Sequence, residues 1–218
     1  MTASKTLDEN RSIAFFDAQF RRPASAAALA LNPFEALALP HLSGAVLDFG
    51  CGLGNLAFAA AQAGCTVTAL DASAAAIDHV RSRAREQGAA VSALCEDLRN
   101  YRIGGAYDSI VSIGLLMFFD CPTALEVLAE LQAHVRPGGV VAINVLVEGT
   151  TYLEMFDPAR HCLFAPTELQ DRFAGWTLLH SAISEFEAPG DTIKRFSTVI
   201  ARKPWLPPGE DARATAPD

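Results

Sequence analysis

Between residues 45 and 147, short apolar stretches alternate with segments that carry more alanine and polar residues. The apolar stretches have the length of strands and lie at 45–49, 66–70, 91–95, 107–113 and 140–147. The last is apolar at nearly every position, which is typical of a strand buried on both faces. The segments between them are predicted helices at 56–63, 74–87 and 123–135. This alternation predicts a parallel sheet with helices on both faces.

The pattern changes on either side of this region. Residues 13–20 carry apolar residues at near-helical spacing, and residues 24–39 predict a helix, a turn at Asn32 and Pro33, and a second helix. Residues 166–173 predict a short helix. Two successive apolar stretches then predict an antiparallel edge hairpin, with strands at 176–186 and 193–201. We therefore divide the chain into a helical arm (1–44), a sheet domain (45–203) and a Pro-rich tail (204–218) expected to be disordered.

Composition narrows the functional classes. The 218 residues carry a formal net charge of −8, which disfavours an extended nucleic-acid surface. The N-terminus lacks the basic and apolar pattern of a signal peptide, and the apolar stretch 110–119 is too short to span a bilayer. A soluble cytoplasmic protein without a membrane partner is expected. The five cysteines form no CxxC pair and are predicted to be reduced, and no metal-ligand cluster is evident.

Three acidic residues stand at the ends of the first three predicted strands: Asp48, Asp71 and Asp97. In a doubly wound sheet these ends line one crevice, where ligands bind. A glycine-rich loop, Gly50-Cys51-Gly52-Leu53-Gly54, follows the first strand and precedes a helix. Glycine lets the backbone approach a ligand closely, and the start of the helix offers free N–H groups to an anion.

The loop disfavours a dinucleotide. The third glycine of a G-x-G-x-x-G motif is missing, because Asn55 occupies its position. Asp48, two residues before Gly50, would repel a pyrophosphate and suits a cationic head. S-Adenosylmethionine carries an ammonium, a sulfonium and a carboxylate. Asp48 is predicted to favour the ammonium, and the helix start to favour the carboxylate.

The other acidic residues fit the nucleoside. Asp71 comes 21 residues after Gly50, the usual distance for a residue that holds both ribose hydroxyls. Asp97 is predicted to accept a hydrogen bond from the adenine amino group, and Leu98 to offer its backbone N–H to the ring. Ala72 or Ile77 would pack on the adenine face.

These motifs resemble those of class I S-adenosylmethionine-dependent methyltransferases. The resemblance covers residues 45–147 and includes Val46-Leu-Asp-Phe-Gly-Cys-Gly-Leu-Gly, the acidic residues above, and Arg136-Pro-Gly-Gly. It implies an α/β fold with a doubly wound, Rossmann-like sheet of seven strands, mostly parallel with an antiparallel C-terminal strand. It also implies S-adenosylmethionine as the cofactor. The residues expected to bind it are Asp48, Gly50, Cys51, Gly52, Asp71, Ala72, Asp97, Leu98 and Ser112.

A narrower resemblance is to the tellurite-resistance methyltransferase family. It rests on four segments: Ser112-Ile-Gly-Leu-Leu-Met-Phe-Phe, Leu163-Phe-Ala-Pro-Thr-Glu-Leu, Gly175-Trp and Arg195-Phe-Ser-Thr-Val-Ile-Ala-Arg-Lys. It implies a small-molecule acceptor such as a tellurium or selenium oxyanion, or another soft nucleophile. Candidate acceptor-binding residues are Arg21 and Arg160, because guanidinium matches oxyanion geometry, with Phe118 and His161.

Two alternatives stay open. One is an enzyme that methylates an oxygen or nitrogen of an organic metabolite, which a large apolar cavity under the segment 151–164 would favour. A small mouth lined by arginine would favour the oxyanion. The other alternative is a non-catalytic module that keeps the cofactor fold, against which the intact acidic residues argue. No catalytic base is evident from the sequence.

Overall fold

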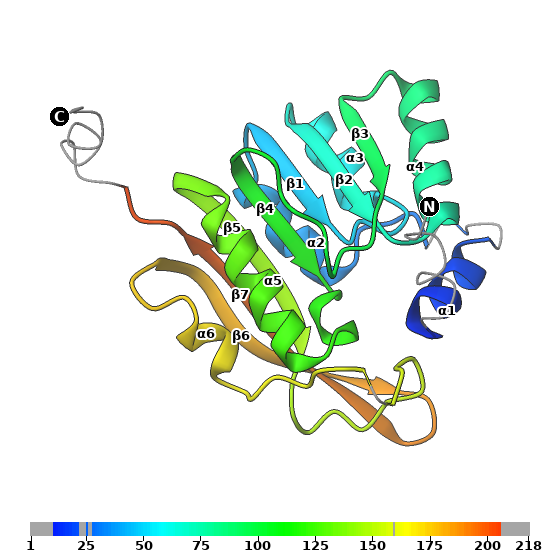
Figure 1. Ribbon diagram of the computed structural model, residues 1–218, viewed down its shortest axis with the longest axis vertical. Coiled ribbons are helices and arrows are strands. Elements are labelled where there is room, and N and C mark those ends of the chain that lie inside the picture. Colours follow the sequence, from blue (N-terminus) through cyan, green and yellow to red (C-terminus); the bar gives the residue numbers. More distant parts are fainter. Residues whose placement is uncertain (1–10, 22–24, 26–27, 159, 206–218) are drawn as a thin grey trace, which may run out of the picture.

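The computed structural model describes residues 11–21, 25, 28–158 and 160–205. One sheet of seven strands has the order β3-β2-β1-β4-β5-β7-β6 (Figure 1). The strands are β1 (Ala45–Phe49), β2 (Thr66–Asp71), β3 (Val91–Cys95), β4 (Tyr107–Ile113), β5 (Val135–Leu146), β6 (Thr177–Ala188) and β7 (Thr192–Arg202). The first five pair in parallel, and β7 runs antiparallel to both β5 and β6. The predicted fold class and edge hairpin are confirmed.

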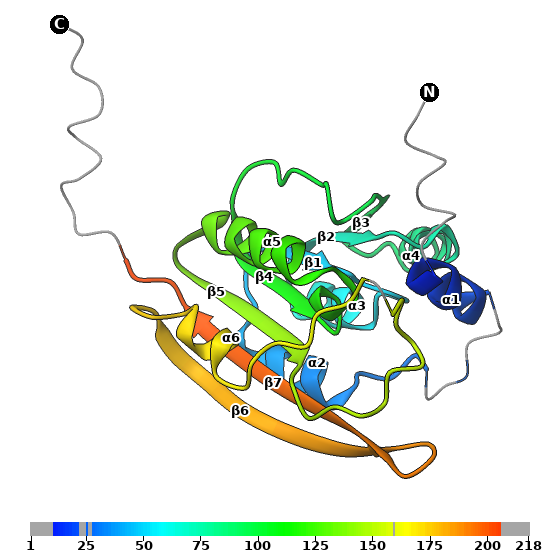
Figure 2. The ribbon, with the colours of Figure 1, turned by 60° about the horizontal axis from the view of Figure 1, so that its bottom comes forward.

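Helices cover both faces of the sheet. They are α1 (Arg11–Phe20), α2 (Pro33–Ala38), α3 (Asn55–Gln62), α4 (Ala74–Gln87), α5 (Cys121–Ala133) and α6 (Glu168–Asp171), with short 3₁₀ turns at Leu39–His41 and Leu116–Phe118. In Figure 1, α5 lies in front of the sheet and α2 and α3 lie behind it. Figure 2 shows the long β6–β7 hairpin forming one edge of the molecule. None of the helices in the described part of the chain is long and apolar enough to cross a membrane.

Alternation along β1 assigns its side chains to the two faces. Leu47 and Phe49 belong to the core cluster that contains the buried leucines of α5. Val46 packs with the buried residues of α3 and α4 on the other face. Because side chains of a strand alternate, Asp48 shares the face of Val46. The acidic side chain at the end of β1 is therefore directed toward the α3 layer.

The ends of α4 are those the sequence predicts. The Ser73 side chain accepts a hydrogen bond from the Ala76 N–H at the N-terminus, and Gly88 closes the C-terminus with a left-handed backbone (φ 59°). This cap places the loop after β2, and with it Asp71, directly against the helix start.

Of the two helices predicted within residues 24–39, the second forms as α2, with Asn32 as its N-cap. The first falls partly outside the described residues, and residues 28–30 form a turn and a bend. The Asn55 side chain donates hydrogen bonds to the carbonyls of Ala28 (2.9 Å) and Ala30 (3.1 Å). Carbonyls bound in this way are not available to a helical ladder. Residues 22–24 and 26–27 lie outside the described residues, as does most of the predicted tail (206–218).

The prediction of five reduced cysteines was wrong. Cys121, at the start of α5, forms a disulfide with Cys162, with their Cα atoms 4.7 Å apart. The two are 41 residues apart in sequence, and no local spacing signals the pair. They meet because the Cys162 N–H bonds to the Met117 carbonyl (3.0 Å), which holds the segment after β5 against the turn before α5. Cys51, Cys65 and Cys95 are free thiols.

Removing this disulfide is expected to lower the free energy of unfolding. Because it closes a loop of about 40 residues, replacing Cys121 and Cys162 by serine should cost about 2–4 kcal/mol. Chemical denaturation of the double variant and of the oxidised native chain measures this difference. The native chain in excess reductant should lose a similar amount. Titration of five free thiols in the unreduced, denatured protein would contradict the pairing.

Candidate cofactor site

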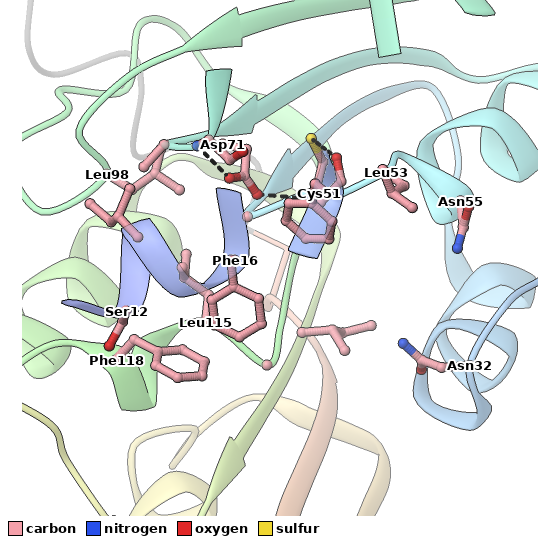
Figure 3. A pocket seen from close by; sticks show the side chains of 18 of the residues that line it. Ser12, Phe16, Asn32, Cys51, Leu53, Asn55, Asp71, Leu98, Leu115 and Phe118 are labelled. Atoms are coloured by element: carbon pink, nitrogen blue, oxygen red, sulfur yellow. Dashed lines mark hydrogen bonds between the residues drawn. The ribbon is translucent and has the colours of Figure 1, made fainter. Parts of the chain in front are cut away.

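A cavity of about 430 Å³ opens at the carboxyl ends of the central strands. Its walls come from the loops after β1, β2, β3 and β4 and from the N-terminal arm (Figure 3). Eight of the residues singled out in the sequence line it: Gly50, Cys51, Gly52, Asp71, Ala72, Asp97, Leu98 and Phe118. The volume is in the range of about 300–1,000 Å³ that is usual for small-molecule sites.

The glycine loop turns back over β2. The N–H groups of Gly50 and Cys51 both donate to the Leu70 carbonyl, at 2.8 and 2.9 Å. Gly50 and Gly52 have φ angles of 92° and 51°, which side-chain-bearing residues rarely adopt. A Cβ atom at Gly50 would also lie 2.9 Å from Leu115. Glycine is therefore required here to bring the backbone to the cavity surface.

Asp71 braces this loop and faces the cavity. One carboxylate oxygen accepts the Gly52 N–H and the other accepts the Ser73 N–H, both at 2.8 Å (Figure 3). Burial raises the pKa of Asp71 above its ordinary value, although these hydrogen bonds oppose the shift. The Ala72 N–H is a further backbone donor to this carboxylate. A carboxylate has about four acceptor sites, so acceptor capacity remains for a hydroxyl group of a ligand.

Asp97 carries a partner that the sequence analysis missed. Arg99 binds both of its carboxylate oxygens, at 2.8 and 2.7 Å. Burial raises the pKa of Asp97, but the hydrogen bonds and charge of Arg99 outweigh it, and the net shift is downward. Because Arg99 also lines the cavity, this part of the lining contains an ion pair rather than a lone carboxylate.

Asp48 and Ser112 lie beneath the cavity and are not among the residues that line it. Asp48 is 5% exposed, and one of its oxygens has no hydrogen-bond partner. Burial, with the charges of Glu35 and Asp71, raises its pKa to about 8. The Ser112 hydroxyl is likewise buried without a partner. A direct contact of either side chain with a ligand stays a prediction.

The structure separates the predicted acceptor residues. Phe118 lines the cavity, whereas Arg21, Arg160 and His161 do not. The Arg21 side chain is 72% exposed and pairs with Asp17 at 2.7 Å. His161 stacks on Phe156 with ring centroids 4.9 Å apart, and Phe156 packs on Phe118 at 5.0 Å. His161 therefore supports the aromatic wall from behind.

The N-terminal arm forms one side of the cavity. Phe16 packs edge-on against Phe118 at 5.0 Å, and both line the cavity with Phe20. Asp17 fixes α1 to the start of α4, where its carboxylate accepts hydrogen bonds from the Ser73 hydroxyl (2.7 Å) and the Ala75 N–H (3.1 Å). The near-helical spacing of residues 13–20 predicted this helix, but nothing in it indicated where the helix docks.

A second missed contribution is Glu35, at the start of α2. It lines the cavity together with Asn32, and the two form a capping box. Burial raises the pKa of the Glu35 carboxyl. The sequence signal was present in Asn32-Pro-Phe-Glu35, a cap followed three residues later by glutamate. No group of three or more potential metal ligands occurs among the residues the structure describes.

The sequence has relatives among curated proteins. Residues 46–139 match the family model described as a methyltransferase domain. The chain is 31% identical over 168 residues to Hemagglutinin 1 of Eikenella corrodens, covering 72% of this chain and 54% of that protein. It is 35% identical over 133 residues to malonyl-[acyl-carrier protein] O-methyltransferase of Pectobacterium atrosepticum, covering 61% and 48%. The chain thus spans about half the length of these curated relatives.

Solved structures show the same fold at low identity. TehB from Haemophilus influenzae superposes with a TM-score of 0.67 at 22% identity, covering 88% of this chain and 67% of that one. The N-methyltransferase NodS from Bradyrhizobium japonicum, in complex with S-adenosyl-L-homocysteine, superposes with a TM-score of 0.69 at 17% identity, covering 89% and 100%. At these identities the likeness concerns the fold.

Proposed function

We propose that this chain uses S-adenosylmethionine to methylate a small organic acceptor with an apolar surface. The match of residues 46–139 to the methyltransferase-domain model supports the reaction class. The observation that carries the proposal is one cavity in which the glycine loop, Asp71 and the Asp97–Leu98 segment meet a wall of phenylalanines. The first three elements fit the cofactor, and the wall fits the acceptor.

The residues present fit S-adenosylmethionine. The positive φ angles of Gly50 and Gly52 open the floor of the site to a ligand. Asp71 retains acceptor sites for the ribose hydroxyls beside the bonds that hold the loop. Acidic side chains outnumber basic ones along the cavity, which suits a ligand with net positive charge.

The acceptor side of the cavity favours an apolar molecule over an oxyanion. Phe16, Phe118 and Phe119 line it together with Leu115 and Ile113. In the described part of the chain, the single basic side chain that lines the cavity is Arg99, which is already paired with Asp97. Arg21 and Arg160 lie outside the lining, so none of the described lining residues offers an unpaired guanidinium to this wall. A desolvated apolar surface would bind an organic body by burial.

The residues of this chain contribute mainly by positioning. When bound, the cofactor supplies a methyl group on a sulfonium, which a nucleophile displaces in line. The phenylalanine wall would orient the acceptor and exclude water from the reacting centre. Glu35 is the cavity carboxyl that burial shifts toward neutrality and that lies away from the nucleoside contacts. No side chain is assigned as a catalytic base.

The sequence resemblance to tellurite-resistance methyltransferases supports one other acceptor class, a chalcogen oxyanion or another soft nucleophile. An oxyanion would need basic side chains in the cavity lining. The Glu35 carboxyl in the lining and the pairing of Arg99 with Asp97 argue against this acceptor class.

Calorimetry followed by an acceptor screen tests the proposal. The native chain should bind S-adenosylmethionine and S-adenosylhomocysteine, and should then methylate phenolic or other apolar small molecules in a radiolabelled methyl-transfer assay. Phe118→Ala should reduce turnover more than cofactor affinity, whereas Leu178→Ala, at an exposed position on β6 outside the cavity lining, should change neither. Absence of cofactor binding would exclude the proposal. Methylation of tellurite or selenite with no organic acceptor would transfer it to the oxyanion class.

A further inference from the structure

One end of the cavity is acidic and distant from the nucleoside contacts. Figure 3 shows Leu98 on one side of Asp71 and Cys51, and Asn55 and Asn32 on the other. If the nucleoside lies against Leu98 and Asp71, the amino-acid part of the cofactor extends past Cys51 toward the two asparagines. Glu35 lines the cavity at this end, next to its capping partner Asn32.

The Glu35 carboxylate is held in a fixed position. One of its oxygens accepts the Asn32 N–H at 2.7 Å, and the Asn32 side chain accepts the Phe34 and Glu35 N–H groups at 2.9 Å. These reciprocal bonds order the side chain before any ligand arrives, which lowers the entropic cost of binding. The remaining acceptor sites of the carboxylate are not used by the capping box.

Two neighbouring acceptors also lack donors. One oxygen of Asp48, a residue 5% exposed, is buried without a hydrogen bond, and the charge of Glu35 acts on this carboxyl. The Asn55 side-chain oxygen is also buried and unpartnered. The Asn55 amide nitrogen donates to the carbonyls of Ala28 and Ala30. These two bonds fix which way the amide group is turned, and therefore where its oxygen lies. Buried acceptor oxygens that lack donors favour the binding of a ligand group that donates hydrogen bonds and carries positive charge.

The charge balance at this end is negative. Arg99, the basic side chain that lines the cavity in the described ranges, pairs with Asp97 at the nucleoside end. Among the described lining residues, the acidic end therefore has no cation to pair with Glu35. An ammonium group supplies both a positive charge and three donors.

We infer that Glu35 binds the α-ammonium group of the cofactor and makes the site selective for ligands with that group. The inference rests on the proposed function, since it takes the cofactor to be S-adenosylmethionine. Glu35 is the contacting residue, and the buried Asp48 carboxyl lies close enough to interact with it electrostatically. The arm thus contributes to recognition of the cofactor as well as to the aromatic wall.

A comparison of two ligands tests this role. S-Adenosylhomocysteine carries the ammonium, and its deaminated analogue keeps the carboxylate and the nucleoside. Glu35→Gln removes the charge but keeps the capping box, which accepts glutamine at this position. By calorimetry, this variant should bind S-adenosylhomocysteine about tenfold or more weakly, and bind the deaminated analogue within about twofold of the native chain. Glu126→Gln, at an exposed position on α5, is the matched control and should change neither affinity.

Equal weakening of both ligands, or no change in either, would overturn the role of Glu35 as ammonium receptor. If Glu35→Gln shows a lower melting temperature, the native chain alone decides, because it should prefer S-adenosylhomocysteine over the deaminated analogue by about tenfold or more. Equal affinity would then overturn the inference. Failure of the native chain to bind either ligand would instead reject the proposed function.

Discussion

Replacing Asp71 by alanine is expected to weaken binding of S-adenosylmethionine by about 2–3 kcal/mol, or roughly 30- to 150-fold. The Asp71 carboxylate both holds the backbone of the glycine loop and is proposed to bind the ribose. Its oxygens hold the backbone of Gly52 and Ser73, and its remaining acceptor sites face the cavity. Alanine would remove the proposed ribose contacts and release the loop that forms the floor of the site.

Calorimetry on the native chain and three variants measures this effect. Asp71→Asn keeps the volume but has one acceptor oxygen, and its NH₂ group would oppose a backbone donor, so it should also lose affinity. Asp78→Ala is the matched control, because this aspartate is 79% exposed on α4. Melting temperatures separate loss of binding from loss of folding. A folded Asp71→Ala variant with native affinity would contradict the assignment of the ribose site.

The sequence predicted the sheet well because its determinants are local. The strands from β1 to β4 and residues 140–146 of β5 are largely apolar stretches, and Ser73 and Gly88 mark the limits of α4. Strand β5 starts earlier than predicted, at Val135, and includes the Arg136-Pro-Gly-Gly segment. The acidic residues and glycines of the cofactor region follow strand ends directly. Their approximate positions therefore follow from topology, since the carboxyl ends of parallel strands meet at one edge.

The rest of the site depends on contacts between distant segments. Cys121 and Cys162 are 41 residues apart in sequence, and no local sequence pattern indicates that they form a disulfide. Arg99 sits two residues after Asp97, yet only the folded loop shows that it pairs with that carboxylate. Helix α1 was predicted, but its docking depends on Asp17 reaching the start of α4. Sequence patterns record periodicity and caps, whereas these contacts arise from tertiary packing.

The predicted acceptor residues show the same limit. Arg21 and Arg160 were predicted because a guanidinium suits an oxyanion. The residue type does not indicate where the side chain points in the folded chain. In the structure Arg21 is exposed and paired with Asp17, and Arg160 is absent from the cavity lining. Phe118 lies in the wall because the turn after β4 must enter the crevice, a consequence of topology. These placements support the proposal of an apolar acceptor over an oxyanion.

Asp48 is expected to make the folded protein less stable as pH rises from about 4 to about 8. Its pKa is about 8 in the folded chain, whereas an exposed aspartate ionises near 3.9. Between these values the folded state holds one proton more than the unfolded state. The free energy of unfolding should therefore fall with rising pH, by up to about 1.4 kcal/mol per pH unit from this group. Below pH 4 both states are protonated, and the contribution is fully present.

Denaturation of the native chain and of Asp48→Asn at pH 5, 6, 7 and 8 isolates this contribution. The asparagine variant does not titrate, so the native chain should lose stability relative to it across the series. Asp78→Asn, an exposed change, should follow the native profile. Parallel profiles for the native chain and Asp48→Asn would show that Asp48 is already ionised when folded.

The same group links protons to the ligand. An ammonium bound at Glu35 would favour the ionised form of Asp48 and lower its pKa. Binding of S-adenosylhomocysteine near pH 7 should then release protons, which calorimetry detects as a dependence of the heat on the ionisation enthalpy of the buffer. The release should be absent in Asp48→Asn and in the native chain with the deaminated analogue. Proton release that persists with that analogue would place its source elsewhere than the acidic end of the cavity.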